Sequence, residues 1–509
     1  MSSSSQIQRN GAPNPLLVLL TASTGCAMTV LDTNVVGIVL PTIARDLGAS
    51  FADIEWVIGS YVLCFAALLL PAGSIADRLG RRRVFLAGIA FFAAASLLCG
   101  VATSAIMLCG ARALQGIGAA FLLAPALAII GHSFHGEAER NRAWAIWGGM
   151  MGLTMALSPI IGGVIANLLG WRWAFFINIP ICAALGAAVI LKIEESRDPE
   201  VGKPDPAGIA LFAASMFFLT AALIYGQEHG WGAPKTLGGF ALGVCGFILF
   251  VMVERAQARP MLDLSLFRRP AFIGAVLAMF AYAGSAQVMA SLLPQFLQNG
   301  MGHGPLEAGF AMLPFALAML AFPYIGRRLG ARLVSRQILV VGLLVVAAGN
   351  ALTGWGASAG QSAMVMAGML VLGAGGGLLN GETQKAIMSV APRDRAGMAS
   401  GISTTSRFSG ILLAFALLSG ILSTATRGHL MASACRGGDP CRRFADAVVA
   451  GDLTQALAGL KGDVREAAIV QAQLAYRAGF STALVAAAIG ALIAAILVSK
   501  LMREPRQAG

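Results

Sequence analysis

Charged residues are scarce in this sequence. Only 12% of its 509 residues are Asp, Glu, Lys or Arg, whereas about 25% is usual in soluble domains. Hydrophobic residues make up 57% of the chain, and the mean hydropathy is +0.76. Polar linkers between separate cores are also lacking, because apolar runs of about 20 residues recur from Leu16 to Val498. These features exclude an ordinary soluble protein and predict an all-α integral membrane protein.

Motifs for nucleotide and metal chemistry are lacking as well. The sequence has no G-x-x-x-x-G-K-[ST] phosphate-binding loop, and its pair His132 and His135 is not in H-E-x-x-H order. The glycine-rich stretch 373–377 falls in an apolar run, where close helix packing explains it. We therefore expect no enzyme activity, no metal and no cofactor. Any transport by this chain must then draw on an ion gradient, with the proton gradient as the energy source.

Fourteen apolar runs are long enough to cross a bilayer. With the N-terminus in the cytoplasm, most of the 36 Lys and Arg residues fall on the cytoplasmic side, as the positive-inside rule requires. The net charge of +12 is then a topology signal rather than a sign of nucleic-acid binding. No cleavable signal peptide is expected. The predicted spans are 16–40, 54–76, 84–102, 106–131, 143–167, 174–192, 207–226, 237–255, 271–293, 306–326, 336–356, 362–383, 398–425 and 477–500.

Two short sequences occur twice at nearly equal offsets. The segment 75–82 (IADRLGRR) returns at 325–332 (IGRRLGAR), and 140–143 (RNRA) returns at 393–396 (RDRA). Such repeats predict two pseudo-symmetric six-helix halves with two helices inserted between them, and a substrate site between the halves near the midplane.

The repeats and the spans together divide the chain into six parts. The predicted parts are a cytoplasmic leader at 1–15, an N-terminal six-helix bundle at 16–192, a cytoplasmic linker at 193–206, inserted helices 7 and 8 at 207–255, a C-terminal six-helix bundle at 271–500 that carries an external loop at 426–476, and a cytoplasmic tail at 501–509.

Four motifs carry a resemblance to a known family. The loop residues Gly73, Asp77, Arg78, Gly80, Arg81 and Arg82 resemble the G-x-x-x-D-R-x-G-R-R/K signature of the major facilitator superfamily. Three further motifs are similar to those of its fourteen-span drug/proton antiporters, the multidrug exporter type. They are Leu31-Asp32-Thr33 with Leu40-Pro41, the run Arg112 to Ala120 that contains Gln115, and Ser158-Pro159 with Gly162-Gly163.

The resemblance implies a proton-coupled secondary exporter of small amphipathic toxic compounds, and hence a role in antibiotic resistance. It places the chain in the bacterial inner membrane as a multi-pass protein with both termini cytoplasmic. Its expected partners are a small-molecule substrate, protons and lipid, and we expect a monomer. A dedicated exporter of one endogenous metabolite would use the same fold and motifs. A receptor or scaffold that has lost transport is a third reading, which the retained Asp32 and Arg112 disfavour.

Asp32 and Arg112 are charges placed inside predicted spans, where each costs about 2.5–3.5 kcal/mol on insertion scales. Asp32 precedes Pro41 by nine residues and Arg112 follows Ser104 by eight. At ~1.5 Å per residue, both lie about 12–13 Å below the outer ends of their spans. Burial and a neighbouring guanidinium act oppositely on the protonation of a carboxylate, so movement or hydration of the pair would load and release a proton. The alternative is a permanent ion pair that only fixes packing.

The other two motifs suit conformational change. Asp77 and the arginines of its loop would form an ionic latch between helices that separate when the cavity opens inward. The positive-inside rule alone would explain the arginines but not Asp77. Because Arg327 occupies the corresponding position of the second half, we expect a one-sided latch. The span containing Ser158, Pro159, Gly162 and Gly163 presents small residues for close, kinked packing, which the resemblance links to sealing the path against leak.

Polar residues inside the spans are candidate contacts of the substrate cavity, although most would form hydrogen bonds between helices. Asp32 is the only acid predicted deep in a span, which makes a dicationic substrate improbable. Arg407 either meets an anionic group or extends toward Glu382, and the sequence favours neither. The candidates are Asn34, Gln115, Tyr282, Gln287, Asn350, Asn380 and Arg407.

The long external loop 426–476 contains Cys435 and Cys441, which bracket the turn sequence Arg-Gly-Gly-Asp-Pro. The topology puts this loop in an oxidising compartment, so we predict a disulfide between them rather than a metal site. Leucines at helical spacing, Leu453, Leu457 and Leu460, predict a small folded cap. Contact with a periplasmic adaptor is the alternative role of this loop.

Overall fold

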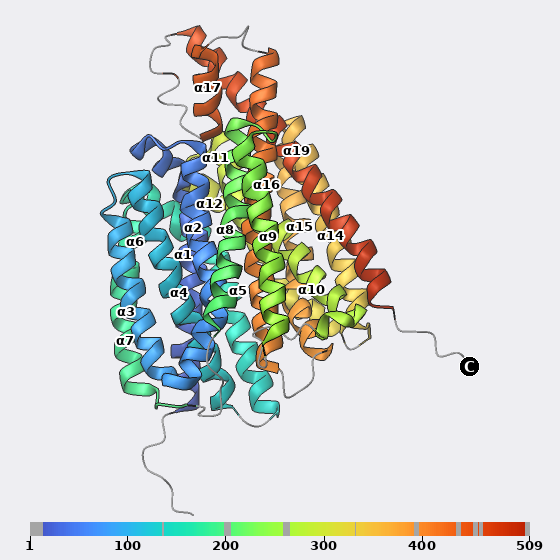
Figure 1. Cartoon of the computed structure of the whole chain (residues 1–509). Coiled ribbons are helices and arrows are strands. Elements are labelled where there is room, and N and C mark those ends of the chain that lie inside the picture. Colours follow the sequence, from blue (N-terminus) through green and yellow to red (C-terminus); the bar gives the residue numbers. More distant parts are fainter. Residues whose placement is uncertain are drawn as a thin grey trace, which may run out of the picture.

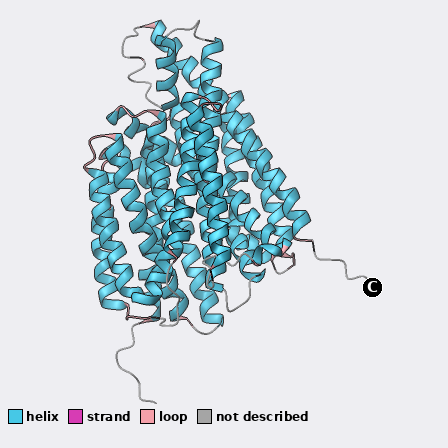
Figure 2. Cartoon of the chain, in the orientation of Figure 1, coloured by secondary structure: helices cyan, strands magenta, loops and turns pink. Residues whose placement is uncertain are grey.

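The computed structural model describes residues 14–134, 137–197, 205–257, 265–330, 332–390, 396–433, 439–450, 457 and 462–503. Their regular structure is entirely helical (Figure 2). Fourteen helices or helix pairs are long and apolar enough to cross a membrane. The predicted fold class, an all-α membrane protein with fourteen spans, is therefore confirmed.

The first six spans form the N-terminal half. The sixth predicted span is divided, because a turn at Ile177 separates a short helix from a longer one. The helices of this half are α1 (Pro15–Leu47), α2 (Phe51–Leu79), α3 (Arg81–Gly100), α4 (Ala105–Ser133), α5 (Glu137–Leu168), α6 (Trp173–Phe176) and α7 (Asn178–Lys192).

The last six spans form the C-terminal half, and the two inserted helices precede it. The ninth span contains a π-helical turn, η2, and the tenth is divided at Met312. The helices are α8 (Pro206–His229), α9 (Pro234–Ala256), the short η1 (Leu266–Arg268), α10 (Pro270–Tyr282), η2 (Ala283–Gln287), α11 (Met289–Asn299), α12 (Pro305–Ala311), α13 (Leu313–Leu329), α14 (Ser335–Ala359), α15 (Ser362–Val390), α16 (Ala396–Ser433), α17 (Asp439–Ala450) and α19 (Asp463–Leu501).

Local sequence signals fix the ends of the first two helices. The side chain of Asn14 accepts a hydrogen bond from the backbone N–H of Leu16 and starts α1. Gly48 ends this helix with φ of 56°, a left-handed conformation that glycine adopts without strain. Ser50 and Asp53 then cap each other's backbone and start α2. These signals place a tight connection between two long apolar helices.

The inserted helices α8 and α9 pack against each other and cover one flank of the molecule. Helix α8 contacts α2 of one half and α16 of the other, and the rings of Trp56 and Phe217 lie 5.6 Å apart at this contact. Figure 1 shows the green pair running along the front of the bundle. On the opposite flank, α5 packs directly on α12 and α13.

The two halves also meet near the end of the molecule that carries α17, called the α17 end below. The side-chain amide of Gln298 in α11 donates a hydrogen bond to the carbonyl of Ile38 in α1 over 2.9 Å. Ser419 of α16 donates to the carboxylate of Glu55 in α2. Helices from both halves are therefore joined at this end of the bundle.

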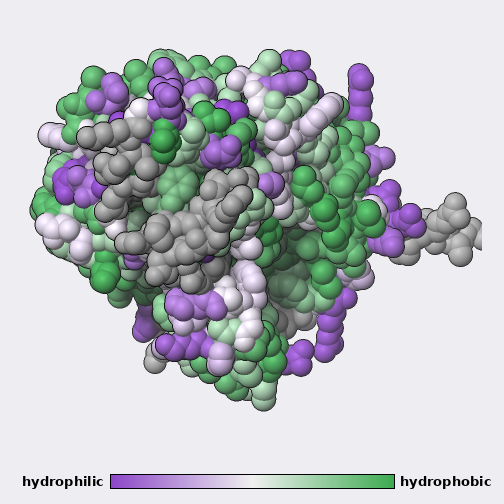
Figure 3. Space-filling view, turned by 90° about the horizontal axis from the view of Figure 1, so that it is seen from above, coloured by the Kyte–Doolittle hydropathy of each residue, from purple (hydrophilic) through white to green (hydrophobic). Residues whose placement is uncertain are grey.

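A helical cap stands above the α17 end (Figure 1). It is built from α17 and from the extensions of α16 and α19, which begin or end beyond the predicted spans. Leu430, Val448 and Ala475 are among the buried residues of its own small hydrophobic cluster. Seen from this end, hydrophilic side chains are scattered over the face, with hydrophobic ones along much of its edge (Figure 3). Cys435 and the side chain of Cys441 lie outside the described residues.

Candidate functional site

An ion pair lies inside the N-terminal half. Nη1 of Arg112 in α4 is 2.6 Å from Oδ2 of Asp32 in α1. The exposed fractions of the two side chains are 1% and 0%. The sequence placed the residues at equal depth in separate spans, and the structure brings them into direct contact. Two charges buried this completely are stable only when each also has hydrogen-bond partners.

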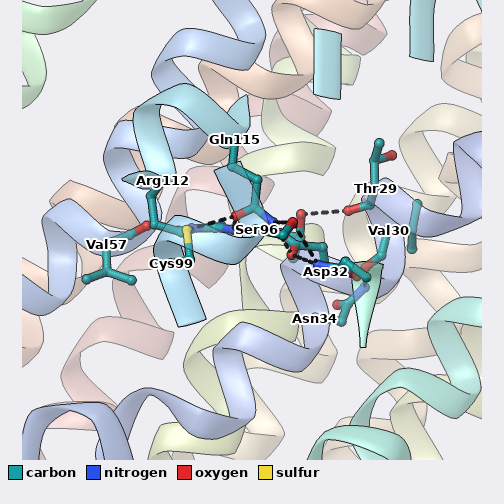
Figure 4. A network of polar contacts seen from close by, with 11 residues as sticks. Thr29, Val30, Asp32, Asn34, Val57, Ser96, Cys99, Arg112 and Gln115 are labelled. Atoms are coloured by element: carbon teal, nitrogen blue, oxygen red, sulfur yellow. Dashed lines mark hydrogen bonds and ion pairs between the residues drawn. The ribbon is translucent and has the colours of Figure 1, made fainter. Parts of the chain in front are cut away.

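Side chains from three helices supply those partners (Figure 4). Gln115, one turn after Arg112, accepts a hydrogen bond from Arg112 at 2.6 Å and donates one to Oδ1 of Asp32 at 2.8 Å. Asn178 of α7 donates a further bond to the same oxygen at 2.9 Å. The hydroxyl oxygen of Ser96 in α3 accepts a hydrogen bond from each of these two amides, over 2.9 Å from Nε2 of Gln115 and 3.4 Å from Nδ2 of Asn178. The carboxylate of Asp32 therefore accepts three hydrogen bonds.

The guanidinium of Arg112 is held from its other sides by α2 and α6. Its Nε donates to the carbonyl of Val57 over 3.1 Å. The ring of Tyr61 lies 4.1 Å from its central carbon, within the range of a cation–π contact, and that of Phe175 lies at 5.9 Å. Every one of these groups belongs to the N-terminal half. Any rearrangement of the ion pair must therefore disturb the packing of α1, α2, α4 and α7 together.

The loop motif around Asp77 also makes its contacts within the N-terminal half. Nε of Arg81, at the start of α3, is 2.7 Å from Oδ1 of Asp77, near the end of α2. The carboxylate of Glu195, which follows α7, accepts bonds from the backbone N–H groups of Arg82 and Arg83. The loop motif is therefore tied to the end of α7. The latch between separating helices stays a prediction.

The small-residue motif of α5 faces the C-terminal half. A Cβ added at Gly163 would lie 2.7 Å from the carbonyl oxygen of Pro305, which starts α12. Conversely, a Cβ on Gly309 of α12 would lie 2.5 Å from the carbonyl oxygen of Pro159. Real Cβ atoms do not approach oxygen so closely, so glycine at both positions permits α5 and α12 to touch. On the same helix, Gly162 faces Ile38 of α1, and the hydroxyl of Ser158 bonds back to Thr154.

The candidate cavity residues have different environments. Asn34 donates to the carbonyl of Val30 in its own helix, and Gln115 belongs to the Asp32 network. Asn350 donates to the carbonyl of Ser285 and thus joins α14 to the π-helical turn. Oε1 of Gln287 makes no hydrogen bond with a described residue. Asn34, Gln115 and Asn350 are thus engaged in hydrogen bonds within or between helices.

The remaining three candidates, Tyr282, Asn380 and Arg407, meet in the C-terminal half. Nη2 of Arg407 lies 3.3 Å from both the backbone and the side-chain oxygen of Asn380. The central carbon of its guanidinium is 5.8 Å from the centre of the Tyr282 ring. Glu382, the other candidate partner of Arg407, instead pairs with Lys385 at 3.1 Å.

Sequence reasoning missed two polar residues that the structure makes prominent. Asn178 bonds to Asp32, and the signal available for it was an amide within an apolar run. Glu55 is 1% exposed and joins the two halves through Ser419. In the sequence, Glu55 is a single acid in the first turn of the second predicted span. An acid at that position is equally typical of the membrane–water interface.

Comparison with known families is consistent with this architecture. The profile of the Major Facilitator Superfamily matches residues 22–415, which include the Asp32 network and most of both halves. The chain belongs to the major facilitator superfamily. Membership in this transporter family, together with efflux-pump relatives, indicates a transporter rather than an enzyme.

Two curated proteins similar to this superfamily protein have names that concern drug resistance or efflux. "Multidrug resistance protein Stp" of Mycobacterium tuberculosis is 32% identical over 409 residues, which cover 80% of this chain and 76% of that protein. "Multidrug efflux pump LfrA" of Mycolicibacterium smegmatis is 31% identical over 477 residues, which cover 94% of both.

Solved structures share the fold of this superfamily protein. A bacterial homolog of the human lysosomal transporter Spinster, in an inward-facing and occupied conformation, superposes with a TM-score of 0.66 and covers 96% of both chains. The sequence identity is 18%, so this likeness concerns the fold alone.

Proposed function

We propose that this chain is a proton-coupled exporter of small amphipathic toxic compounds across a bacterial inner membrane. The single observation that carries the proposal is the Asp32–Arg112 pair, fully buried within a membrane span and enclosed by a hydrogen-bond network. Buried ionisable residues in membrane spans are retained mainly for ion or substrate pathways. The names of the relatives, a multidrug resistance protein and a multidrug efflux pump, support the export of drugs.

Proton binding to Asp32 would release a conformational restraint. The protonated acid is neutral, so the charge attraction that holds Arg112 against α1 disappears. Arg112 then keeps only the Val57 carbonyl, the Gln115 amide and the Tyr61 ring as partners for a buried charge. A buried charge without its counter-ion costs several kcal/mol, which favours any arrangement of α1 and α4 that rehydrates it. Proton loading thereby shifts the population between conformations.

The proton gradient supplies enough energy for export. One proton moving inward yields ~2.3 kcal/mol per 100 mV and ~1.4 kcal/mol per pH unit. With one proton exchanged per neutral substrate molecule, 100 mV and one pH unit together support an accumulation ratio of several hundred, since each ~1.4 kcal/mol is a factor of ten.

The remaining roles in the proposal follow the topology. The termini and the Asp77 loop lie in the cytoplasm, where Asp77 acts in the latch, and the cap around α17 lies outside. The close contact of α5 with α12 seals the path during the conformational change. The protein acts as a monomer without a bound cofactor, and the cap is the surface that a periplasmic adaptor would contact.

The test is substrate-induced proton release from purified protein in proteoliposomes that contain a trapped pH-sensitive dye. Lipophilic cations, neutral antibiotics and organic acids are added to the wild type, to Asp32→Asn and to the control Asp46→Asn, which removes an acid whose side chain is 45% exposed. We expect several unrelated compounds to displace protons in the wild type and the control but not in Asp32→Asn. A silent wild type, or an equal response of Asp32→Asn, overturns proton coupling through Asp32. A response to one compound alone supports a dedicated metabolite exporter.

A further inference from the structure

Arg407 is a charge in a membrane span that forms no ion pair with a carboxylate of the described residues. It lies nine residues into the span predicted from 398, about 13 Å from the cytoplasmic end at ~1.5 Å per residue. Its direct polar contacts are the two oxygens of Asn380, both neutral acceptors at 3.3 Å. Nε of the same guanidinium is buried and makes no hydrogen bond with any described residue. The guanidinium thus keeps unused donor capacity.

The acid that the sequence suggests as a partner of Arg407 already forms another ion pair. Glu382 of α15 pairs with Lys385, one turn further along the same helix, at 3.1 Å. In the structure, Arg407 therefore contacts Asn380 and does not extend to an ion pair with Glu382. A positive charge inside a span costs about 2.5–3.5 kcal/mol on insertion scales, and its retention normally reflects a partner or a pathway.

The buried pair of the N-terminal half does not balance Arg407 either. Asp32 and Arg112 neutralise each other, and the Asp32 carboxylate already accepts three hydrogen bonds from the N-terminal half. These three charged groups in the spans therefore carry one net positive charge, which belongs to Arg407. Protonation of Asp32 would add to this positive charge rather than remove it.

The surroundings of Arg407 suit an anionic group attached to an apolar body. The ring of Tyr282 lies 5.8 Å from the guanidinium, and its buried hydroxyl makes no hydrogen bond with a described residue. Tyr282 immediately precedes the π-helical turn η2, a feature that occurs frequently at functional sites. Beside Arg407, the ring of Phe408 packs edge-on against Phe65 of the N-terminal half at 4.3 Å. Two donors of the C-terminal half with unused capacity thus lie close to each other, and the residue after Arg407 takes part in an aromatic contact between the halves.

We propose that Arg407 and Tyr282 form an anion-recognition site and that the exported compounds carry a carboxylate or a comparable acidic group. The guanidinium offers its free Nε–H to one oxygen of the acid, the Tyr282 hydroxyl donates to the other, and the apolar body of the compound packs on the Phe65–Phe408 contact. Arginine suits this role because its planar donors match the geometry of a carboxylate. The inference rests on the proposed export function and names the class of substrate.

The first test compares three ligands that share a naphthalene ring and differ in charge: 2-naphthoate, its methyl ester and (2-naphthylmethyl)trimethylammonium. Binding to the purified full chain is measured by titration calorimetry for the wild type, Arg407→Gln, Arg407→Lys and the control Arg336→Gln. The control removes a positive charge at the start of α14, where Arg336 donates a hydrogen bond to the Ser499 carbonyl and to no other described residue. We expect the wild type and the control to prefer the acid at least tenfold, Arg407→Lys to keep part of this preference and Arg407→Gln to lose it. Equal binding of the ester or the cation to the wild type, or an acid preference that survives in Arg407→Gln, overturns the proposal.

The second test does not depend on the affinity of any one ligand. In a cysteine-free background, Thr404→Cys places a thiol one helical turn from Arg407 on the same face of α16. Its reaction rates with a sulfonate-bearing and a trimethylammonium-bearing methanethiosulfonate reagent are compared with and without Arg407→Gln. We expect the ratio of anionic to cationic rates to fall at least tenfold when Arg407 is replaced. An unchanged ratio, or no reaction with either reagent, overturns the site.

The outcomes separate this inference from the proposed function. If cations alone release protons in proteoliposomes, proton-coupled export stands and the acidic substrate class falls. If 2-naphthoate binds through Arg407 but no organic acid releases protons, the anion site stands and proton coupling falls.

Discussion

Ser419 of α16 donates a hydrogen bond to the carboxylate of Glu55 in α2, although the two residues are 364 positions apart and belong to opposite halves. The exposed fraction of each is 1%. Together with the bond from Gln298 to Ile38, this contact joins the halves at the α17 end. An alternating-access transporter must break both bonds whenever this end opens.

Replacing Ser419 by alanine should therefore favour opening of the α17 end. A buried hydrogen bond to a charged group contributes about 1.5–3 kcal/mol, so the ratio of open to closed molecules should rise at least about tenfold. Spin-label distances between the α17 ends of α2 and α16 would report this shift. The matched control is Ser423→Ala, which removes a buried hydroxyl one turn away that bonds to no described residue. Equal distance distributions in the two variants would show that the Glu55 contact does not restrain opening.

Arg112→Lys should abolish most proton coupling while the charge is retained. A lysine ammonium can reach Asp32, but it cannot also contact Gln115 and the Val57 carbonyl, because these partners surround different edges of the guanidinium. We expect the initial rate of proton release to fall at least tenfold. Arg172→Lys serves as the control, because Arg172 pairs with Asp46 at the same 2.6 Å but is 40% exposed. Similar losses in both variants would argue against a special role for the buried network.

Gly163→Ala should force α5 away from α12. The new methyl group would lie 2.7 Å from the Pro305 carbonyl oxygen, and such overpacking costs about 1–3 kcal/mol. Gly148→Ala, on the same helix, meets no atom within 4 Å and should be neutral or stabilise by up to about 1 kcal/mol. Thermal unfolding and the passive proton leak of proteoliposomes would be measured for both. A tight, stable Gly163→Ala protein would mean that the contact of α5 with α12 does not seal the path.

Asp77→Asn separates the contribution of Asp77 to the stability of its loop from its action as a latch. The bond to Arg81 joins the end of α2 to the start of α3 and is partly exposed, so its loss should change the free energy of unfolding by at most about 1 kcal/mol. If Asp77 also acts as a latch, the transport rate falls at least tenfold without a matching loss of stability. Asp446→Asn, which breaks the pair with Arg427 in the cap, is the control. Unimpaired transport by Asp77→Asn would limit its role to local structure.

The predicted disulfide between Cys435 and Cys441 can be counted by mass spectrometry. The other six cysteines, among them Cys26 and Cys182, are free thiols. Alkylation of the denatured protein should therefore add six groups without a reductant and eight after reduction. Eight groups before reduction would exclude the disulfide.

Much of the fold could be predicted because its signals are local. Apolar runs fixed the number of spans, and caps such as Asn14 and Ser50 mark where helices begin. The length of α16 was underestimated because its extension into the cap carries polar residues and does not resemble a membrane span. The division of the ninth span at η2 also escaped prediction, since a π-helical turn depends on how neighbouring helices pack rather than on composition.

The candidate site was predictable only in part. Asp32 and Arg112 stand out because charges are costly inside apolar runs, whatever surrounds them. Asn178 and Ser96 do not, because a neutral polar residue in a span is common and its partner depends on the rotation of each helix. Glu55 escaped notice for a related reason, since its burial depends on the docking of α16 against α2.

Because α8 and α9 cover one flank of the protein, the two flanks present different helices to the lipid. On one flank, the line where α2 meets α16 lies behind α8. On the other, α5 packs on α12 and α13. A lipophilic compound dissolved in the bilayer therefore meets the inserted pair on the first flank, whereas on the second it meets the close contact of α5 with α12.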